Sequence, residues 1–341
     1  MTKLHYWPTV VMVALFPAAC YLARIRPANL SFVPGVLLVW FLLSLPWAAF
    51  LFLFGVPGAC SQLLRPSPNL PKNWKQMAAS TIAVWAYLAL GILIGIYYGA
   101  IVVSARGYNL YDAVLAKADA VLLFGHSVIG ISHRATTLIP VAEFIYLAMF
   151  GIMGAGMMLL CLSGQVEAAF EMSSSIIVAY ILSTTCFAIW PSAGPFSLCA
   201  DHLSHFSHGS LSLLAQQRAL SSAAKLWRHE GVVTVPLAYF ISFPAMHVTQ
   251  PLIVAWFLRR WKRMQATIII YCMLLVPSIL VLEWHYFADI LGGIAVAAVS
   301  IFLVTVNPLP QANPLDQRLI IPAPISPSHH PSSELAGRRQ P

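Results

Sequence analysis

The sequence predicts an all-α fold, a polytopic bundle of about eight transmembrane helices. Hydrophobic residues make up 59% of the 341 residues and charged residues only 9%. Mean hydropathy is +0.78, and apolar runs of about 20 residues, long enough to cross roughly 30 Å of hydrocarbon, recur along the chain. Lys and Arg lie mainly in the short segments between these runs. One membrane bundle is therefore expected rather than separate soluble domains.

Each expected span is an apolar run bounded by polar or charged residues. The first run follows Met1 and Lys3 and is itself followed by Arg24. Because no small-residue cleavage site is clear before Arg24, we interpret it as a retained span rather than a signal peptide. The expected spans are residues 6–23, 33–57, 79–103, 138–162, 172–190, 243–258, 266–283 and 286–306.

A basic segment, Arg259-Arg260-Trp261-Lys262-Arg263, predicts the orientation of the bundle. Short cytoplasmic loops are rich in Lys and Arg, so this segment is expected inside. Alternation of the spans then places the connections near residues 241 and 285 on the outer or luminal side. In a bacterium, the protein is expected in the inner membrane with this side facing the periplasm. Arg106 and Lys117 fall on the outer side in this scheme, against the general tendency.

The formal net charge of +8 does not indicate nucleic-acid binding, because the cations lie in loops that set membrane orientation. The six cysteines form no disulfide framework, since four of them lie inside apolar runs.

Two connections are too long to be simple turns. Residues 104–137 carry an amphipathic stretch from Leu110 to Leu123, expected as an interfacial helix. Residues 191–241 contain a helix-like stretch from Leu211 to Glu230 and lead into residues 242–247, so we expect them to cap a site there. We therefore expect N-terminal spans (1–103), a membrane core (104–306) and a Pro-rich disordered tail (307–341).

Chemistry is expected where polar groups interrupt the last apolar runs. His285 and Asp289 are four residues apart at the start of the final span and so share one helical face. A carboxylate in this position can accept a hydrogen bond from one ring nitrogen and leave the other free to attack or to carry a proton. His247 lies in the first turn of another span, after Ser242 and Pro244.

By the alternation of the spans, His247 and His285 must return to the same side of the membrane. The two helix N-termini beside them would bring together partial positive charge and free N–H groups, which suit a phosphate. Two histidines, a carboxylate and an anion-binding pocket together predict phosphoryl transfer through a histidine nucleophile.

The two groups Phe243-Pro244-Ala245-Met246-His247 and His285-Tyr286-Phe287-Ala288-Asp289-Ile290 resemble the histidine motifs of the type 2 phosphatidic acid phosphatase superfamily. The segment from Pro191 to Pro195 resembles the Gly-Pro element of its inositol phosphorylceramide synthase branch. The resemblance covers roughly residues 110 to 306 and implies a six-helix catalytic core.

The resemblance implies a role for each motif residue. His285 would be the nucleophile that forms a phosphohistidine, Asp289 would orient it, and His247 would protonate the leaving oxygen and then activate an alcohol or water. No metal or other cofactor would be required. The substrate would be a phospholipid or lipid-linked phosphate reached from the bilayer, and the acceptor would decide between an inositolphosphotransferase-like transferase and a phosphatase.

Three departures from the family pattern concern phosphate binding. Ala245 replaces the usual serine, Ser278 is followed by Ile279 rather than Arg, and the basic motif that clamps phosphate is absent. Because a negative transition state needs positive charge, we expect Arg228 to supply it, with Lys225 and Arg218 as alternatives. Ser242 and Gly194 are the other expected substrate-binding residues.

Two other interpretations stay open. His202, His205 and His208, with Asp201 adjacent, have a spacing that a metal cluster could use, although polar loop residues explain them as well. The departures from the family pattern also fit a non-catalytic lipid or solute carrier that retains remnants of the motif. The sequence leaves the oligomeric state open.

Overall fold

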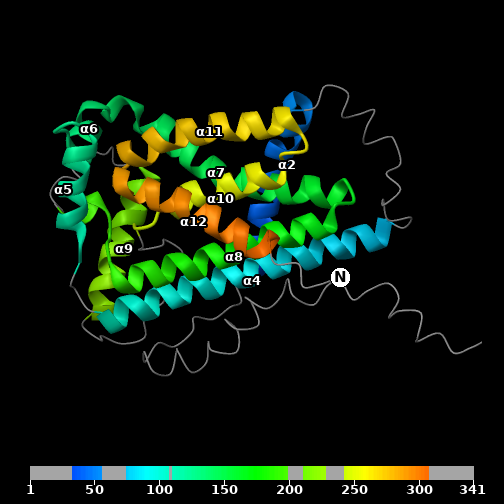
Figure 1. Cartoon of the computed structure of the whole chain (residues 1–341), viewed down its shortest axis with the longest axis horizontal. Helices are drawn as coiled ribbons and strands as arrows, with labels where there is room; N and C mark the ends of the chain where they lie inside the picture. Colours follow the sequence, from blue (N-terminus) through cyan, green and yellow to red (C-terminus); the bar gives the residue numbers. More distant parts are fainter. Residues whose placement is uncertain (1–32, 56–73, 107–109, 199–209, 228–241, 307–341) are drawn as a thin grey trace, which may run out of the picture. The chain divides into compact units, whose positions relative to one another are not determined.

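Helices account for all regular structure in residues 33–55, 74–106, 110–198, 210–227 and 242–306, the parts that the computed structural model describes. Within them the predicted all-α bundle is confirmed (Figure 1). The long helices are α2 (Val33–Gly55), α4 (Trp74–Arg106), α7 (Ile139–Leu162), α8 (Val166–Ile189), α11 (Lys262–Val281) and α12 (Phe287–Thr305).

Five helices in the described residues are long and apolar enough to cross a membrane. They correspond to α4, α7, α8, α11 and α12, and each coincides with an expected span. The expected span 33–57 forms α2, in which Trp40–Leu51 is a shorter apolar segment. The expected span 6–23 lies outside the described residues, so the predicted total of about eight remains a prediction.

The expected span 243–258 forms a shorter helix, α10 (Met246–Phe257), of 12 residues. At 1.5 Å per residue it is about 18 Å long, less than the hydrocarbon thickness. It is largely buried because it packs against α7, α8, α11 and α12. The shortest of the core helices is therefore the central one, and the site described below lies at its N-terminus.

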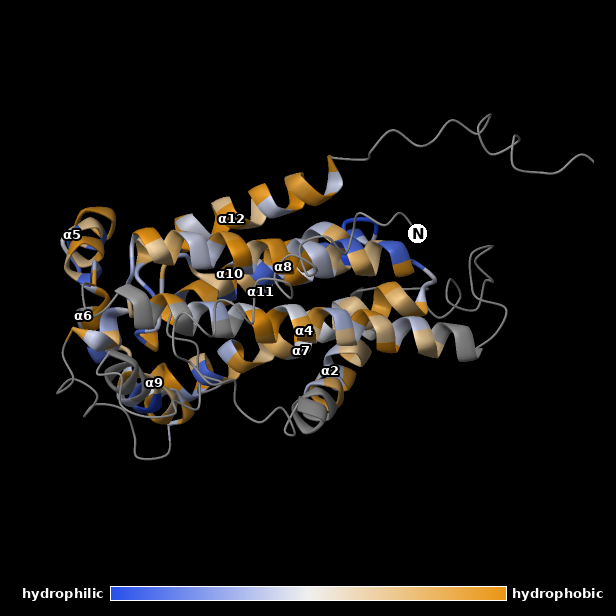
Figure 2. Ribbon diagram, turned by 90° about the horizontal axis from the view of Figure 1, so that it is seen from below, coloured by the Kyte–Doolittle hydropathy of each residue, from blue (hydrophilic) through white to orange (hydrophobic). Residues whose placement is uncertain are grey.

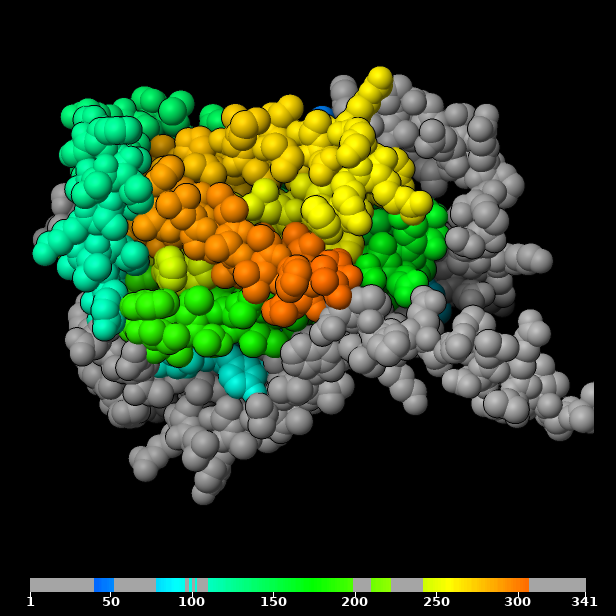
Figure 3. Space-filling model, in the orientation of Figure 1, coloured from blue at the N-terminus to red at the C-terminus, as the bar shows by residue number. Residues whose placement is uncertain are grey.

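Three helices outside the spans lie at one end of the bundle, on the left in Figure 1. They are α5 (Asp112–Leu122), α6 (Val128–Arg134) and α9 (Leu211–Trp227). The predicted amphipathic stretch forms α5, and the predicted helix after residue 211 forms α9. Ser127 caps α6 by accepting a hydrogen bond from the amide of Gly130 at 3.0 Å. In Figure 3 the α5–α6 segment covers the end of the bundle at which α12 begins.

The outer faces of the long helices are apolar, as Figure 2 shows for α12. Large hydrophobic side chains such as Ile270, Met273, Leu291 and Phe302 are exposed in the protein alone. Such a surface is stable only in an apolar solvent, which supports a multi-pass integral membrane protein.

Helix α2 packs closely against α7. The indole N–H of Trp40 donates to the carbonyl of Phe150 at 2.7 Å. A Cβ atom at Gly154 would lie 1.9 Å from the hydroxyl oxygen of Ser44, so only glycine permits this approach. Helix α2 is thus an integral part of the bundle.

Candidate active site

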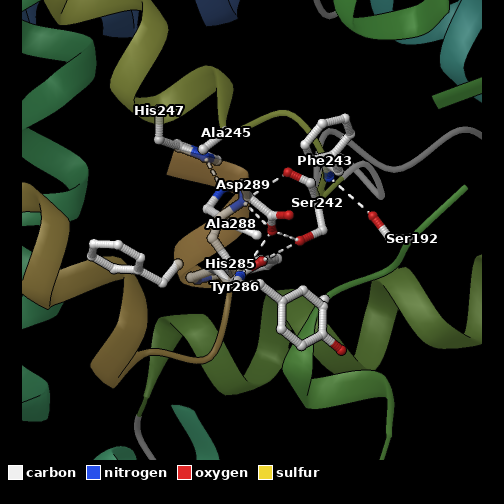
Figure 4. A network of polar contacts seen from close by, with 12 residues as sticks. Ser192, Ser242, Phe243, Ala245, His247, His285, Tyr286, Ala288 and Asp289 are labelled. Atoms are coloured by element: carbon white, nitrogen blue, oxygen red, sulfur yellow. Dashed lines mark hydrogen bonds and ion pairs between the residues drawn. The ribbon is translucent and has the colours of Figure 1, made fainter. Parts of the chain in front are cut away.

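The site is built around two histidines that meet at one end of the bundle. His247 lies in the first turn of α10, and His285 lies in the turn between α11 and α12. Nδ1 of His247 lies 2.9 Å from Nε2 of His285 (Figure 4). The prediction that the alternating spans return both histidines to one side is confirmed. His285 is 1% exposed, whereas His247 is half-buried.

The hydrogen bonds of these rings determine which nitrogens carry protons. Nδ1 of His285 lies 2.9 Å from the carbonyl of Ser242, and a carbonyl only accepts, so this nitrogen carries the hydrogen. In neutral His285, Nε2 is then the acceptor, and Nδ1 of His247 must donate to it. The lone pair of the expected nucleophile is therefore held by a hydrogen bond from the expected acid.

Tyr146 of α7 completes the chain of hydrogen bonds. Its hydroxyl lies 2.8 Å from Nε2 of His247, which is an acceptor in the tautomer deduced above, so the tyrosine donates. Its ring is stacked on Trp284, with centroids 5.8 Å apart, and lies 4.7 Å from the His247 ring. Tyr146 thereby fixes both the orientation and the tautomer of His247.

Asp289 lies behind His285 rather than in direct hydrogen-bond contact with it. Its Oδ2 is 3.5 Å from Nδ1 of His285, while the carbonyl of Ser242 takes the shorter contact. The same carboxylate oxygen accepts from the Ser242 hydroxyl and from the amide of Tyr286 at 2.8 Å. Ser242 therefore links the ring to the carboxylate: its carbonyl accepts from His285 and its hydroxyl donates to Asp289.

Two carboxylates of α5 hold the backbone of the site in place. Asp119 accepts from the amides of Phe287 and Ala288 at 2.7 and 3.0 Å, and so caps α12. Asp112 accepts from the amides of Ala193 and Gly194 and from the hydroxyl of Tyr286. Burial raises the pKa of both carboxyl groups, and the backbone hydrogen bonds oppose the shift.

These contacts correct one expectation about phosphate binding. We expected free N–H groups at the N-termini of both helices, but those of Tyr286, Phe287 and Ala288 at the start of α12 already meet carboxylates. At the start of α10, the amides of Met246 and His247 have no carbonyl partner within the helix. The α10 N-terminus is therefore the better anion site.

Residues 192–194, which precede α9, pack against the two turns that carry His247 and His285. Gly194 has a φ of +115°, and a Cβ there would lie 2.7 Å from the carbonyl oxygen of Trp284, so the position requires glycine. Ser192 accepts at its hydroxyl from the amide of Phe243 at 3.0 Å (Figure 4). In this structure the Gly194 amide and the Ser242 hydroxyl are engaged by carboxylates, and their direct contact with substrate stays a prediction.

Glu283 is a fourth buried carboxyl group near the histidines. It is 0% exposed and has a φ of 57°, in the left-handed region that side chains rarely adopt. Burial raises its pKa to about 7, and the Ser132 hydroxyl opposes the shift. Helix α9 packs over this turn, because Gln216 donates to the carbonyl of Leu282 at 2.6 Å. The expectation that the 191–241 connection covers the site is met for its described part.

The expected cation lies outside the described residues, as do the three histidines of the metal hypothesis, His202, His205 and His208. Arg228 follows directly after α9, and Arg218 is exposed on that helix. Among the described residues, the hydrogen bonds and ion pairs of His247, His285 and Asp289 involve no Lys or Arg.

A protein-family model described as the PAP2 superfamily matches residues 113–303, more than half of the chain. The chain belongs to the PAP2 superfamily. No curated protein and no solved structure matches it. The family match begins within α5 and ends within α12, so it includes both histidines, Asp289 and Tyr146. Helices α2 and α4 lie outside it.

Membership of the PAP2 superfamily supports a lipid phosphatase or phosphotransferase type of function and association with the membrane. The structure of this PAP2 chain also shows three site residues that were not predicted from the sequence: Asp112, Asp119 and Tyr146. Asp112 and Asp119 are seven residues apart, two helical turns, so one face of the amphipathic stretch carried a usable signal. Tyr146 lies within an apolar run and carried none.

Proposed function

We propose that this PAP2 chain transfers or hydrolyses the phosphoryl group or phospho-headgroup of a membrane lipid through a phosphohistidine at Nε2 of His285. The observation that carries the proposal is the 2.9 Å contact between Nε2 of His285 and Nδ1 of His247. With Nδ1 of His285 committed to Ser242, only Nε2 has a lone pair to attack phosphorus.

In the first step, Nε2 of His285 attacks the phosphorus of the lipid phosphate. A P–N bond forms and the bond from phosphorus to the lipid oxygen breaks. The acid is the imidazolium form of His247, in which the Nε2–H donates to the hydroxyl of Tyr146. As the phosphate enters, the Nδ1–H of His247 leaves Nε2 of His285 and its proton passes to the leaving oxygen, so that His247 becomes neutral. Nucleophile and acid are adjacent, so one phosphate group can contact both.

In the second step, an acceptor hydroxyl attacks the phosphohistidine. Its proton passes to Nδ1 of His247, the new P–O bond forms, and the P–N bond breaks to restore His285. The hydroxyl of Tyr146 both donates and accepts, so it can hold Nε2 of His247 in either protonation state. Water as acceptor gives a phosphatase, and a lipid or polyol hydroxyl gives a transferase of the inositol phosphorylceramide synthase type.

The phosphate needs positive charge that the histidine pair does not supply alone. The α10 N-terminus contributes unpaired amide groups beside His247. Arg228 is proposed to contribute the cation, since it follows α9, the helix that packs over the histidine turn. Wild-type turnover and substrate affinity in Arg228→Ala would remove this part of the proposal.

The site is proposed to face the outer or luminal side of the membrane. The exposed cations Arg259, Arg260, Lys262 and Arg263 lie at the other end of α10 from His247, and such segments are retained in the cytoplasm. Labelling of a cysteine placed at the exposed position His126 by a membrane-impermeant thiol reagent in intact cells tests this orientation. Labelling that requires permeabilised cells overturns it.

The experiment for the reaction uses purified full-length protein and phosphatidic acid carrying a radiolabelled phosphate. We expect acid-labile, alkali-stable label on the protein, lost in His285→Ala and retained in His126→Ala, which removes an exposed histidine outside the site. Release of free phosphate without alcohol acceptors indicates a phosphatase. Transfer to an added alcohol indicates a transferase.

His247→Ala tests the general-acid role of His247 separately from the nucleophile role of His285. We expect it to slow turnover of lipid phosphate strongly but turnover of a nitrophenyl phosphate ester only weakly, because nitrophenolate leaves without a proton. Turnover that survives in His285→Ala would falsify the phosphohistidine route. Absence of turnover with every phospholipid, together with lipid movement between vesicles, would favour the carrier.

A further inference from the structure

We propose that an apolar cleft between α2, α7 and α11 holds one hydrocarbon chain of the lipid substrate. The cleft has a volume of about 240 Å³. Since about 10–15 Å³ of such volume is enough for one water-sized group, the cleft has room for a run of several methylene groups. This inference rests on the proposed function and assigns a binding site to a substrate chain.

The lining of the cleft is suited to hydrocarbon. It is almost entirely apolar and includes Leu51 of α2, Ala148 and Ile152 of α7, and Ile268 and Leu274 of α11. Its two hydroxyl groups already donate within the protein: Tyr271 to the carbonyl of Ile145 at 2.8 Å and Thr267 to that of Arg263 at 2.9 Å. A polar headgroup would find few partners there, whereas a saturated chain needs none.

The cleft and the site are neighbours across one turn of α7. Ile145 and Ala148 line it, and Tyr146, between them in sequence, bonds to His247. Tyr271 also lines it and fixes the Ile145 carbonyl. The same turn of α7 therefore has the catalytic hydrogen bond on one side and the cleft on the other.

The depth of the cleft also fits a lipid whose phosphate lies at the histidines. The site lies beside the C-terminal end of α11, after Val281. At 1.5 Å per residue, Leu274 is about 10 Å and Ile268 about 20 Å along α11 from that end. This range lies within the hydrocarbon layer of roughly 30 Å, where a chain hanging from a phosphate at the surface would run.

Helix α2 forms one wall of the cleft but lies outside residues 113–303, the part of the chain matched by the family model. The N-terminal region, which the catalytic motifs leave without a role, would thus help to select the lipid chain. Helix α2 lies close against α7 beside the cleft, because a Cβ atom at Gly151 would lie 2.0 Å from the ring of Trp47, which lines the cleft.

The test compares dioleoyl phosphatidic acid with dihexanoyl phosphatidic acid, whose chains are too short to reach the cleft. We expect Leu274→Trp, at the exposed edge of the cleft, to lower kcat/KM for the dioleoyl lipid about tenfold, and to leave the dihexanoyl lipid within about twofold. Met273→Trp, its exposed neighbour outside the lining, is the matched control and should change neither. Equal effects of Leu274→Trp on both lipids overturn the proposal.

A second measurement does not depend on turnover. Phosphatidic acid with a photoreactive diazirine near the end of one chain should label peptides of α2, α7 and α11 in the wild-type protein. The label should fall in Ala148→Phe, which fills the cleft. Equal labelling by a diazirine phosphatidylcholine that is not a substrate identifies the cleft as a contact for bulk lipid and overturns the proposal. If the label is specific but no phosphohistidine forms, the cleft proposal stands and the proposed reaction is wrong.

Discussion

The hydroxyl of Tyr146 lies 2.8 Å from Nε2 of His247, on the side of the ring opposite His285. One residue on α7 thus determines which nitrogen of His247 can exchange a proton with the substrate. Because Nε2 is occupied, the exchangeable proton is on Nδ1, the atom that faces the expected nucleophile.

Tyr146→Phe removes this hydrogen bond and keeps the aromatic packing on Trp284. We expect kcat for the lipid substrate to fall by about tenfold, which corresponds to roughly 1.4 kcal/mol and to the loss of one hydrogen bond. Turnover of the nitrophenyl ester should change little, since its leaving group needs no acid. The ratio of the two rates is the measurement.

Tyr87→Phe is the control for this prediction. The hydroxyl of Tyr87 also makes a buried hydrogen bond, 3.0 Å from the hydroxyl of Ser174, but Tyr87 lies neither at the histidines nor in the cleft. It should lower thermal stability without changing the ratio of the two rates. If Tyr146→Phe also slows both substrates equally, Tyr146 has only a structural role.

The sequence was sufficient for the bundle and the meeting of the histidines, because both follow from hydrophobic length and chain alternation. Long apolar runs predicted α4, α7, α8, α11 and α12, and parity placed His247 beside His285. The amphipathic pattern likewise predicted α5, although not what its carboxylates bind.

Side-chain partners could not be predicted in the same way. We expected Asp289 to accept the His285 hydrogen bond because the four-residue spacing predicts one helical face, but His285 lies in the turn before α12, so the two residues share no helical face. The Ser242 carbonyl, 43 positions away along the chain, takes the shorter contact. We also expected the first amides of α12 to be free, and Asp119, 168 positions away from Phe287, takes one of them. Such long-range contacts leave no local pattern.

Ser242→Ala distinguishes a positioning role from direct phosphate binding. The hydroxyl donates to the buried carboxylate of Asp289, so its loss should destabilise the protein by about 1–3 kcal/mol, seen as a lower melting temperature in detergent. kcat should fall while KM changes little. A rise in KM with unchanged melting temperature would instead indicate that Ser242 binds the substrate directly.

Asp119→Ala tests whether α5 holds the start of α12. The change leaves the amides of Phe287 and Ala288 without their acceptor, and two such losses should cost roughly 2–4 kcal/mol of stability. Hydrogen exchange at the start of α12 should increase. Lys117→Ala, an exposed change on the same helix, should leave exchange there as in the wild type; a similar increase in both variants would indicate general loosening of α5.

Glu283 predicts how stability depends on pH. Its pKa is raised from 4.5 to about 7 by burial, so between these values the folded protein retains a proton that the unfolded chain has lost. Stability is therefore greatest below the unfolded value and decreases as pH rises through about 7, by roughly 3 kcal/mol in all. The melting temperature of the wild-type protein should fall between about pH 5 and pH 8.

Glu283→Gln isolates this contribution, because the amide is close in shape and does not titrate in this range. We expect the melting temperature of the variant to fall less than that of the wild-type protein between about pH 5 and pH 8. Glu167→Gln, at an exposed position in the first turn of α8, should keep the wild-type slope. A wild-type slope in Glu283→Gln would mean that other groups, and not this buried carboxyl beside the histidines, govern the response to pH.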